Sequence, residues 1–272
     1  MSKTKIAAIQ MASGPNVNAN LLEAARLISK AVEAGAGLVV LPENFAIMGM
    51  KEQDKLKVQE AQGEGPIQEF LAQQAKQNNI WLVGGTIPLT SATPGKVMAS
   101  CLLFDDGGQE VARYDKIHLF DVSLEEDGEQ YNESASTSRG DKICVVDTPF
   151  GRLGLAICYD LRFPEQFRAM LDQGMELCAI PSAFTAITGQ AHWEVLVRAR
   201  AIENSSYIIA AAQGGYHING RETHGDSMVV GPWGVIVDRL PRGSGVVVTE
   251  LDRERIASIR RNFPAIEHRR LA

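Results

Sequence analysis

One stretch of the sequence leads from an apolar run through a sharp turn into a helical pattern: Gly154-Leu155-Ala156-Ile157-Cys158-Tyr159-Asp160-Leu161-Arg162-Phe163-Pro164-Glu165. A helical pattern follows at residues 166–171, then an apolar run at 177–180, a second helix at 190–203 and a further apolar run at 207–211. Short apolar runs that alternate with amphipathic segments are typical of the strands and helices of a layered α/β domain. This stretch therefore predicts an α/β fold.

The rest of the chain continues the alternation and adds hairpins. Strands are expected at residues 6–10, 37–41 and 81–87, with helices at 18–33, capped by Asn18 or Asn20, and at 67–77. The turn Asp105-Asp106-Gly107-Gly108 lies between apolar runs at 97–104 and 110–114, which predicts a hairpin. Further strands are expected at 144–147, 153–157, 227–230, 235–237 and 245–250, before a helix at 253–261. Hairpins among strand–helix units predict mixed sheets. Since no linker interrupts the pattern, we expect one domain over residues 1–272.

Composition and charge exclude several classes of protein. The 272 residues are 45% hydrophobic and carry a net charge of −6, from 27 basic and 33 acidic residues. A negative chain repels nucleic acid and anionic membranes, so neither is an expected partner. No apolar run approaches the ~20 residues that span a bilayer, and the first residues lack the pattern of a signal peptide. The four cysteines form no C-x-x-C pair. We therefore expect a reduced, cytoplasmic protein.

Residues 121–140 differ from the rest of the chain because they are acidic and have few apolar side chains. Six acids stand there against one base: Asp121, Glu125, Glu126, Asp127, Glu129 and Glu133. Such a composition predicts a long, exposed loop.

Three reactive side chains each follow an apolar strand: Glu43, Lys116 and Cys158. Ligand sites of α/β sheets gather at strand ends, which favours a common site. Each residue also has a structural interpretation: the cysteine as a small core residue, the glutamate as a cap or surface charge, and the lysine as a solvated side chain. The sharp turn after Cys158 favours a thiol presented to a pocket. His118 is either the base for that thiol or a packed histidine.

Motifs for other chemistries are missing from the sequence. There is no G-x-S-x-G, no P-loop and no G-x-G-x-x-G, which argues against a serine nucleophile and a nucleotide cofactor. The five histidines contain no H-x-x-x-H pair, and we expect no metal.

Three motifs resemble the signatures of the nitrilase (carbon–nitrogen hydrolase) superfamily, in the same order. They are Leu41-Pro42-Glu43, Tyr114-Asp115-Lys116-Ile117-His118-Leu119-Phe120-Asp121 and the stretch from Gly154 to Glu165 quoted above. The resemblance covers essentially the whole chain. Within the superfamily, the stretch from His118 to Val122 and the tail His268-Arg269-Arg270 look most like the deaminated glutathione amidases.

The resemblance implies a four-layer αββα sandwich with two mixed sheets, and catalysis without metal or organic cofactor. It places a Glu-Lys-Cys triad at Glu43, Lys116 and Cys158. In this chemistry the thiol attacks an amide carbonyl, Glu43 moves the proton, and Lys116 with the backbone N–H of Tyr159 holds the oxyanion. The superfamily's second glutamate matches Glu133, which would orient Lys116 or the substrate; otherwise Glu133 is a solvated loop acid.

The same resemblance implies a small-molecule amide substrate. Deaminated glutathione, cleaved to 2-oxoglutarate and cysteinylglycine as metabolite repair, is the leading expectation, and an ω-amidase acting on 2-oxoglutaramate is the alternative. A catalytically silent binding or scaffold protein is the alternative from another class. Four residues are expected to bind substrate: Tyr159, Arg162, Phe184 and Thr185. Arg162 would offer charge to an anionic group or form a structural ion pair.

Assembly is expected to be a homodimer or a higher homo-oligomer. The apolar stripe of Trp193, Leu196, Val197 and Ala201 is most simply core, yet the matching helix packs across a dimer interface in the superfamily. The tail at about 252–272 is the second expected interface segment.

Overall fold

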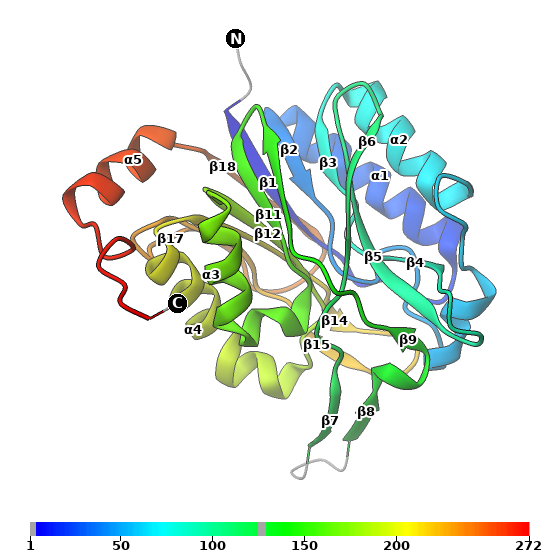
Figure 1. Ribbon diagram of the computed structural model, residues 1–272. Helices are drawn as coiled ribbons and strands as arrows, with labels where there is room; N and C mark the ends of the chain where they lie inside the picture. Colours follow the sequence, from blue (N-terminus) through cyan, green and yellow to red (C-terminus); the bar gives the residue numbers. More distant parts are fainter. Residues whose placement is uncertain (1–3, 125–128, 272) are drawn as a thin grey trace.

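A computed structural model describes residues 4–124 and 129–271 of the chain. The ends of the predicted domain 1–272, and the predicted loop acids Glu125, Glu126 and Asp127, lie outside the described residues. The strands form two large sheets with helices on their outer faces (Figure 1).

The first sheet has 8 strands, with β18-β1-β2-β3-β5-β4 as its main path and β6 and β9 paired to β5. Its strands are β1 (Lys5–Gln10), β2 (Ala36–Val40), β3 (Trp81–Val83), β4 (Ile87–Thr90), β5 (Val97–Phe104), β6 (Glu110–Asp115), β9 (Thr137–Ser138) and β18 (Gly245–Glu250). β1 pairs with β2 in parallel and with β18 antiparallel, so the sheet is mixed.

The second sheet has 6 strands in the order β10-β11-β12-β13-β16-β17. They are β10 (Cys144–Thr148), β11 (Gly151–Leu155), β12 (Leu177–Ser182), β13 (Tyr207–Ala212), β16 (Ser227–Val230) and β17 (Ile236–Leu240). The middle strands β11, β12 and β13 are parallel, and the outer pairs are antiparallel. The stretch quoted first therefore begins at the end of β11, in the parallel centre of this sheet, and leads through the turn at Cys158 into the helix that starts at Pro164.

The helices form the two outer layers. α1 (Val17–Glu33) and α2 (Pro66–Asn78) cover the first sheet, and α3 (Pro164–Asp172) and α4 (Ala186–Asn204) cover the second (Figure 1). Apolar side chains of the two sheets meet in one buried cluster that includes Ile6, Leu38, Leu155 and Ile209. The four-layer αββα sandwich with two mixed sheets is thus confirmed. α5 (Arg253–Asn262) follows β18 and buries Ile256 and Ile259.

The helix α1 was predicted correctly from the spacing of its apolar residues, but its N-cap was not. Its buried residues, Ala24, Leu27, Ile28 and Ala31, recur at helical spacing. The cap, however, is Asn16, whose side chain accepts a hydrogen bond from Ala19 N at 3.0 Å. The predicted caps Asn18 and Asn20 were therefore wrong by at least two positions.

Three other expectations need correction. The expected strand 81–87 is two strands, because Gly84 and Gly85 turn the chain between β3 and β4. The expected loop 121–140 contains the hairpin of β7 (Asp121–Leu124) and β8 (Glu129–Asn132), a short helix at Glu133–Ala135, and β9. The strand expected at 235–237 begins one residue later and extends to Leu240.

The apolar stripe on α4 belongs to the interior. Trp193, Val197 and Ala201 are each 0% exposed within this chain, so the simpler expectation of a core stripe is confirmed. Leu196 is partly buried against the same cluster. Within the described ranges, no helix combines the length and the apolar character needed to cross a membrane.

Candidate active site

All eight predicted site residues line one cavity of about 450 Å³, a volume typical of small-molecule sites. The strand ends of both sheets contribute Glu43, Lys116, Cys158 and the residues after β12. Segment 47–55 and the β7–β8 hairpin supply further walls. The structure therefore brings the predicted residues together, while their individual roles stay predictions.

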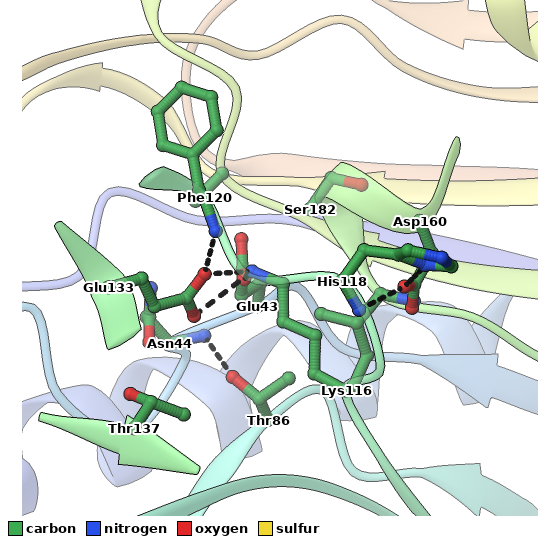
Figure 2. A network of polar contacts seen from close by, with 12 residues as sticks. Glu43, Asn44, Thr86, Lys116, His118, Phe120, Glu133, Thr137, Asp160 and Ser182 are labelled. Carbon is green, nitrogen blue, oxygen red and sulfur yellow. Dashed lines mark hydrogen bonds and ion pairs between the residues drawn. The ribbon is translucent and has the colours of Figure 1, made fainter. Parts of the chain in front are cut away.

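Glu43 lies at the end of the β2 segment, where the fully buried β2 gives way to Leu41 and Pro42. Its own backbone carbonyl accepts from Gln213 Nε2 at 3.0 Å. The next residue, Asn44, donates its N–H to Thr86 Oγ1 at 2.8 Å (Figure 2). The carboxylate of Glu43 is thus attached to a fixed backbone and is 5% exposed.

Lys116 is held between two carboxylates (Figure 2). Its Nζ lies 2.8 Å from Glu43 Oε1, and 3.1 and 2.9 Å from the two oxygens of Glu133. Glu133 also accepts the N–H of Phe120 at 2.7 Å. Lys116 is 2% exposed and the Glu133 side chain 14%, so the interpretation of Glu133 as a solvated loop acid is wrong. The Lys116 ammonium attracts the Glu133 carboxylate into the cavity, although the surrounding segment of the chain is polar and acidic.

Cys158 stands at the first position of the turn that follows β11. Its φ is 46°, a left-handed conformation that costs a non-glycine residue about 1–2 kcal/mol. The turn is held by Asp160, whose N–H donates to Ile157 O at 2.9 Å and whose Oδ2 accepts from Ile157 N at 2.9 Å. Such a turn directs the thiol into the cavity, where Cys158 remains 8% exposed.

The electrostatics of the cavity keep the thiol protonated and the lysine charged. Burial, and then the charge of Glu43, raise the pKa of Cys158 well above its usual value, although Lys116 acts in the opposite direction. Burial alone would lower the pKa of Lys116, but the charges of Glu133 and Glu43 outweigh it and raise that pKa. Burial likewise works against ionisation of Glu133, yet Lys116 and the Phe120 N–H hold its pKa below the usual value.

His118 is turned away from the thiol. Its Nδ1 lies 2.7 Å from Asp160 Oδ1 (Figure 2). Its ring stacks on that of Phe163, with the centroids 3.7 Å apart. It does not line the cavity. The interpretation of His118 as the base for Cys158 is therefore wrong, and Glu43, which lines the same cavity as the thiol and whose charge raises the pKa of the thiol, is the base that the site offers.

The residues predicted to bind substrate differ in how far their polar groups are already engaged by the protein. The guanidinium carbon of Arg162 lies 5.2 Å from the ring centre of Phe184 and 5.8 Å from that of Tyr159. Arg162 forms no ion pair within the described chain, and its Nη1 is 3.2 Å from His192 Nδ1. Thr185 is already engaged as the cap of α4, because its Oγ1 accepts from Thr188 N at 3.2 Å.

Sequence reasoning missed part of the lining. Segment 47–55 contributes Lys51 and Lys55, and the hairpin of β14 (Gly214–Tyr216) and β15 (Glu222–His224) contributes Asn219 and Arg221. The dipeptide Asn219-Gly220 is a strong hairpin signal that could have located this turn, although nothing local shows that it faces the cavity. Among the described residues, no group of three His, Cys, Asp or Glu side chains is placed to hold a metal ion.

Comparison with known proteins agrees with this geometry. The family model of the carbon–nitrogen hydrolases matches residues 5–261. The chain belongs to the carbon–nitrogen hydrolase family. A deaminated glutathione amidase from Synechocystis sp. is 44% identical over 266 residues, which cover 97% of each protein. This carbon–nitrogen hydrolase is therefore an enzyme of the superfamily that its three motifs resemble.

Solved structures show the same architecture. A branch 10 nitrilase-superfamily protein from Saccharomyces cerevisiae has a TM-score of 0.88 at 33% identity, covering 98% of this chain and 96% of that one. An amidase from Nesterenkonia sp., solved with acrylamide added to its active-site cysteine, has a TM-score of 0.78 at 26% identity, covering 96% and 99%.

Proposed function

We propose that this carbon–nitrogen hydrolase is an amidase that cleaves deaminated glutathione to 2-oxoglutarate and cysteinylglycine through a thioester on Cys158. The convergence of Cys158, Glu43 and Lys116 in one enclosed cavity carries the proposal. The similarity to the Synechocystis deaminated glutathione amidase supports the choice of substrate.

Acylation begins from a neutral thiol, because burial and Glu43 raise the pKa of Cys158. Glu43 takes the thiol proton while the sulfur attacks the amide carbonyl carbon, and an S–C bond forms. The charge that develops on the carbonyl oxygen meets the Lys116 ammonium and the N–H of Tyr159, each donor being worth about 3 kcal/mol when well placed. The C–N bond then breaks, and the proton on Glu43 passes to the leaving amine.

Deacylation uses the same groups in reverse order. Glu43 accepts a proton from a water molecule that attacks the thioester carbonyl, and Lys116 again faces the oxyanion. The C–S bond breaks, and the proton returns to the sulfur. Glu133 contributes by holding Lys116, since both of its oxygens lie within 3.1 Å of Nζ.

The nucleophile is tested by Cys158→Ala, with Cys144→Ala as a matched control because Cys144 does not line the cavity. We expect Cys158→Ala to lose turnover by about 10⁴-fold or more while it remains folded, and Cys144→Ala to keep it. Intact-mass spectrometry of the wild type during turnover should show an acyl adduct. Normal activity of Cys158→Ala would overturn the assignment of the nucleophile, and a ligand bound without any adduct would favour the binding or scaffold alternative.

The substrate is tested by comparing kcat/KM for deaminated glutathione and 2-oxoglutaramate. Both share the acyl half, so both pass through the same thioester and only the leaving-group side differs. We expect deaminated glutathione to be preferred. A tenfold preference for 2-oxoglutaramate, about 1.4 kcal/mol of differential transition-state binding, would make the enzyme an ω-amidase with the same mechanism.

The proposal extends to the setting in which the enzyme works. Deaminated glutathione is a transamination by-product, so the reaction would be metabolite repair in the cytoplasm. A single domain over 1–272 and a homodimer or higher homo-oligomer complete the proposal. Activity in a clarified cytoplasmic fraction tests the location: recovery of the enzyme in another compartment would contradict it.

A further inference from the structure

We propose that Arg221 binds a carboxylate group of the substrate and so sets the preference of this enzyme for anionic amides. The inference deepens the proposed function and rests on it for the identity of the substrate. Three observations carry it: the rigid placement of Arg221, the lack of a carboxylate partner for it among the described residues, and the charge of the catalytic residues.

Arg221 is placed by a hairpin that is tied to both sides of the cavity. His217 N donates to Arg221 O at 2.9 Å and closes the turn. The ring of His217 is itself fixed, with Nδ1 at 2.8 Å from Ser13 O and Nε2 at 2.7 Å from Thr223 Oγ1. Asn219 Nδ2 donates to Gly49 O at 2.7 Å. The backbone of Arg221 is therefore preorganised at the wall.

The Arg221 guanidinium has no carboxylate partner in the described part of the chain. Its Nη2 donates to Ala183 O at 3.0 Å, and its guanidinium carbon lies 5.1 Å from the ring centre of Tyr131. Its Nε is buried and has no hydrogen-bond partner among the residues that the structure describes. By contrast, Lys116 has two carboxylates and Lys55 pairs with Glu52. A guanidinium that lines the cavity and has no carboxylate partner among the described residues is available to an anionic group of a ligand.

The catalytic residues make a cation necessary. Glu43 and Glu133 carry two negative charges against the single positive charge of Lys116, so the buried group has a net charge of −1. An anionic substrate entering this cavity meets repulsion unless other charges offset it. Arg162 and Arg221 are the arginines of the lining. A planar guanidinium matches a carboxylate in geometry as well as charge.

A purely structural role for Arg221 makes a different prediction. Arg221 donates to the carbonyl of Ala183, and the backbone of Ala183 acts to lower the pKa of the Cys158 thiol. If Arg221 served only to position Ala183, its loss would lower kcat equally for every amide. If it binds a substrate carboxylate, its loss raises KM for acids and spares neutral amides.

The test measures kcat and KM of Arg221→Gln on deaminated glutathione, on 2-oxoglutaramate and on pentanamide, a neutral amide of similar length. We expect KM for at least deaminated glutathione to rise by about thirtyfold or more, kcat to change little, and kcat/KM for pentanamide to change less than about threefold. Arg221→Lys should recover part of the loss. Arg198→Gln is the control, because Arg198 also donates to a backbone carbonyl, that of Gly234, without lining the cavity.

Binding of glutarate, measured by calorimetry, separates this inference from the proposed function. We expect Arg221→Gln to bind glutarate at least about tenfold more weakly, which is about 1.4 kcal/mol. If the wild type hydrolyses neither acid but its glutarate binding depends on Arg221, the proposed function fails and the inference stands. Equal losses of kcat on acids and on pentanamide, unchanged kinetics, or glutarate binding that is absent or indifferent to Arg221 would each overturn the inference.

Discussion

Lys116 is a charged side chain that is almost entirely enclosed, at 2% exposure. A lone buried ammonium would lose its charge, but Glu43 and Glu133 lie within hydrogen-bond distance and keep it charged. The same arrangement makes the site sensitive to the loss of any one member, because the remaining charges stay buried. Each of Lys116, Glu43 and Glu133 is therefore needed for the charge balance of the site, and the contribution of each can be tested by a single substitution.

Glu133 should contribute to stability only above acid pH. Its pKa in the folded chain lies below the usual 4.5, so its contribution is fully present above about pH 4.5 and is lost as pH falls through the folded value. Wild-type protein should therefore lose unfolding free energy more steeply below about pH 4.5 than Glu133→Gln does, as measured by urea unfolding across pH. Parallel curves for the two proteins would contradict the assignment.

The Cys158 thiol should be slow to alkylate at neutral pH. Its pKa is raised above the usual 9.0, and only the thiolate reacts. We expect the rate with iodoacetamide, followed on the Cys158 peptide by mass spectrometry, to keep rising through pH 9, whereas free cysteine levels off above about pH 9. A plateau near pH 7 would instead indicate a resting thiolate and remove the need for Glu43 as base.

Asp160 hydrogen-bonds to both the segment after β6, which carries Lys116, and the turn after β11, which carries Cys158. These hydrogen bonds fix the position of Lys116 relative to Cys158. One oxygen of Asp160 accepts from Ile157 N at 2.9 Å and from the Tyr114 hydroxyl at 2.6 Å. The other accepts from His118 N at 3.1 Å. The segment after β6 and the turn after β11 therefore share one buried carboxylate, which is 0% exposed.

Asp160→Asn should weaken both stability and catalysis. An amide nitrogen cannot accept, so at least one donor loses its partner, and we expect a loss of about 2–4 kcal/mol in unfolding free energy. We also expect kcat to fall for acidic and neutral amides alike, because the geometry of the nucleophile changes. Asp147→Asn is the control, since Asp147 forms an exposed pair with Arg152 and should cost less than about 1 kcal/mol. Similar losses of unfolding free energy and kcat for the two variants would contradict the proposed role of Asp160 in joining the two segments.

Gly85 controls the segment that carries Glu43. Its φ is +57°, and a Cβ added there would lie 2.2 Å from Pro42 O. Gly85→Ala should therefore displace Pro42 and the neighbouring Glu43, with a loss of stability of about 2 kcal/mol or more and a clear fall in kcat. Gly95→Ala separates the effect of backbone conformation from the effect of contact. Gly95 also has a positive φ, of +76°, and a Cβ added there meets no atom of the described residues within 4 Å. If Gly95→Ala reduces activity as much, contact with Pro42 is not the cause.

A group of apolar side chains is exposed to solvent on the outer surface of the molecule, around the helix α4. Ile202 on α4 packs near Gly234, and the ring of Trp233 lies 5.4 Å from that of Phe263. Ile202, Trp233 and Phe263 are 53%, 53% and 58% exposed, and Val195 on the same helix is 68% exposed. Exposed apolar groups of this kind mark association surfaces.

This outer region, rather than the buried Trp193 stripe, should form the expected homodimer interface. We expect light scattering at micromolar concentration to give about twice the 29.6 kDa chain mass or more, and Val195→Glu with Ile202→Glu to shift it to the monomer. Leu22→Glu is the control, because Leu22 is 74% exposed on α1. A wild-type monomer would contradict the dimer, and a dimer unaffected by the double substitution would place the interface elsewhere.

The sequence by itself determined the α/β class with mixed sheets and the three strand-end motifs, and the resemblance of those motifs to a family implied the four layers. Burial on one side of a helix or strand leaves a period of 3.6 or 2 in the residues, so the helix at 18–33 and the parallel strands at 153–157, 177–180 and 207–211 could be predicted locally. The order of the motifs around Glu43, Lys116 and Cys158 was likewise visible along the chain, and it identified the family.

Only the tertiary structure decided which side chains meet. Lys116 contacts Glu43 across 73 positions, and no local pattern encodes such a contact. The acidic segment 121–140 was predicted to be exposed because its composition is polar, yet Glu133 is drawn inward by a buried ammonium. From the sequence, His118 could be either the base for the thiol or a packed histidine, and its contacts with Asp160 and Phe163 show that it is packed. Arg221 reaches the cavity only because a hairpin folds back over it. Charges and hydrogen bonds act across space rather than along the chain, so their partners depend on the assembled sheets.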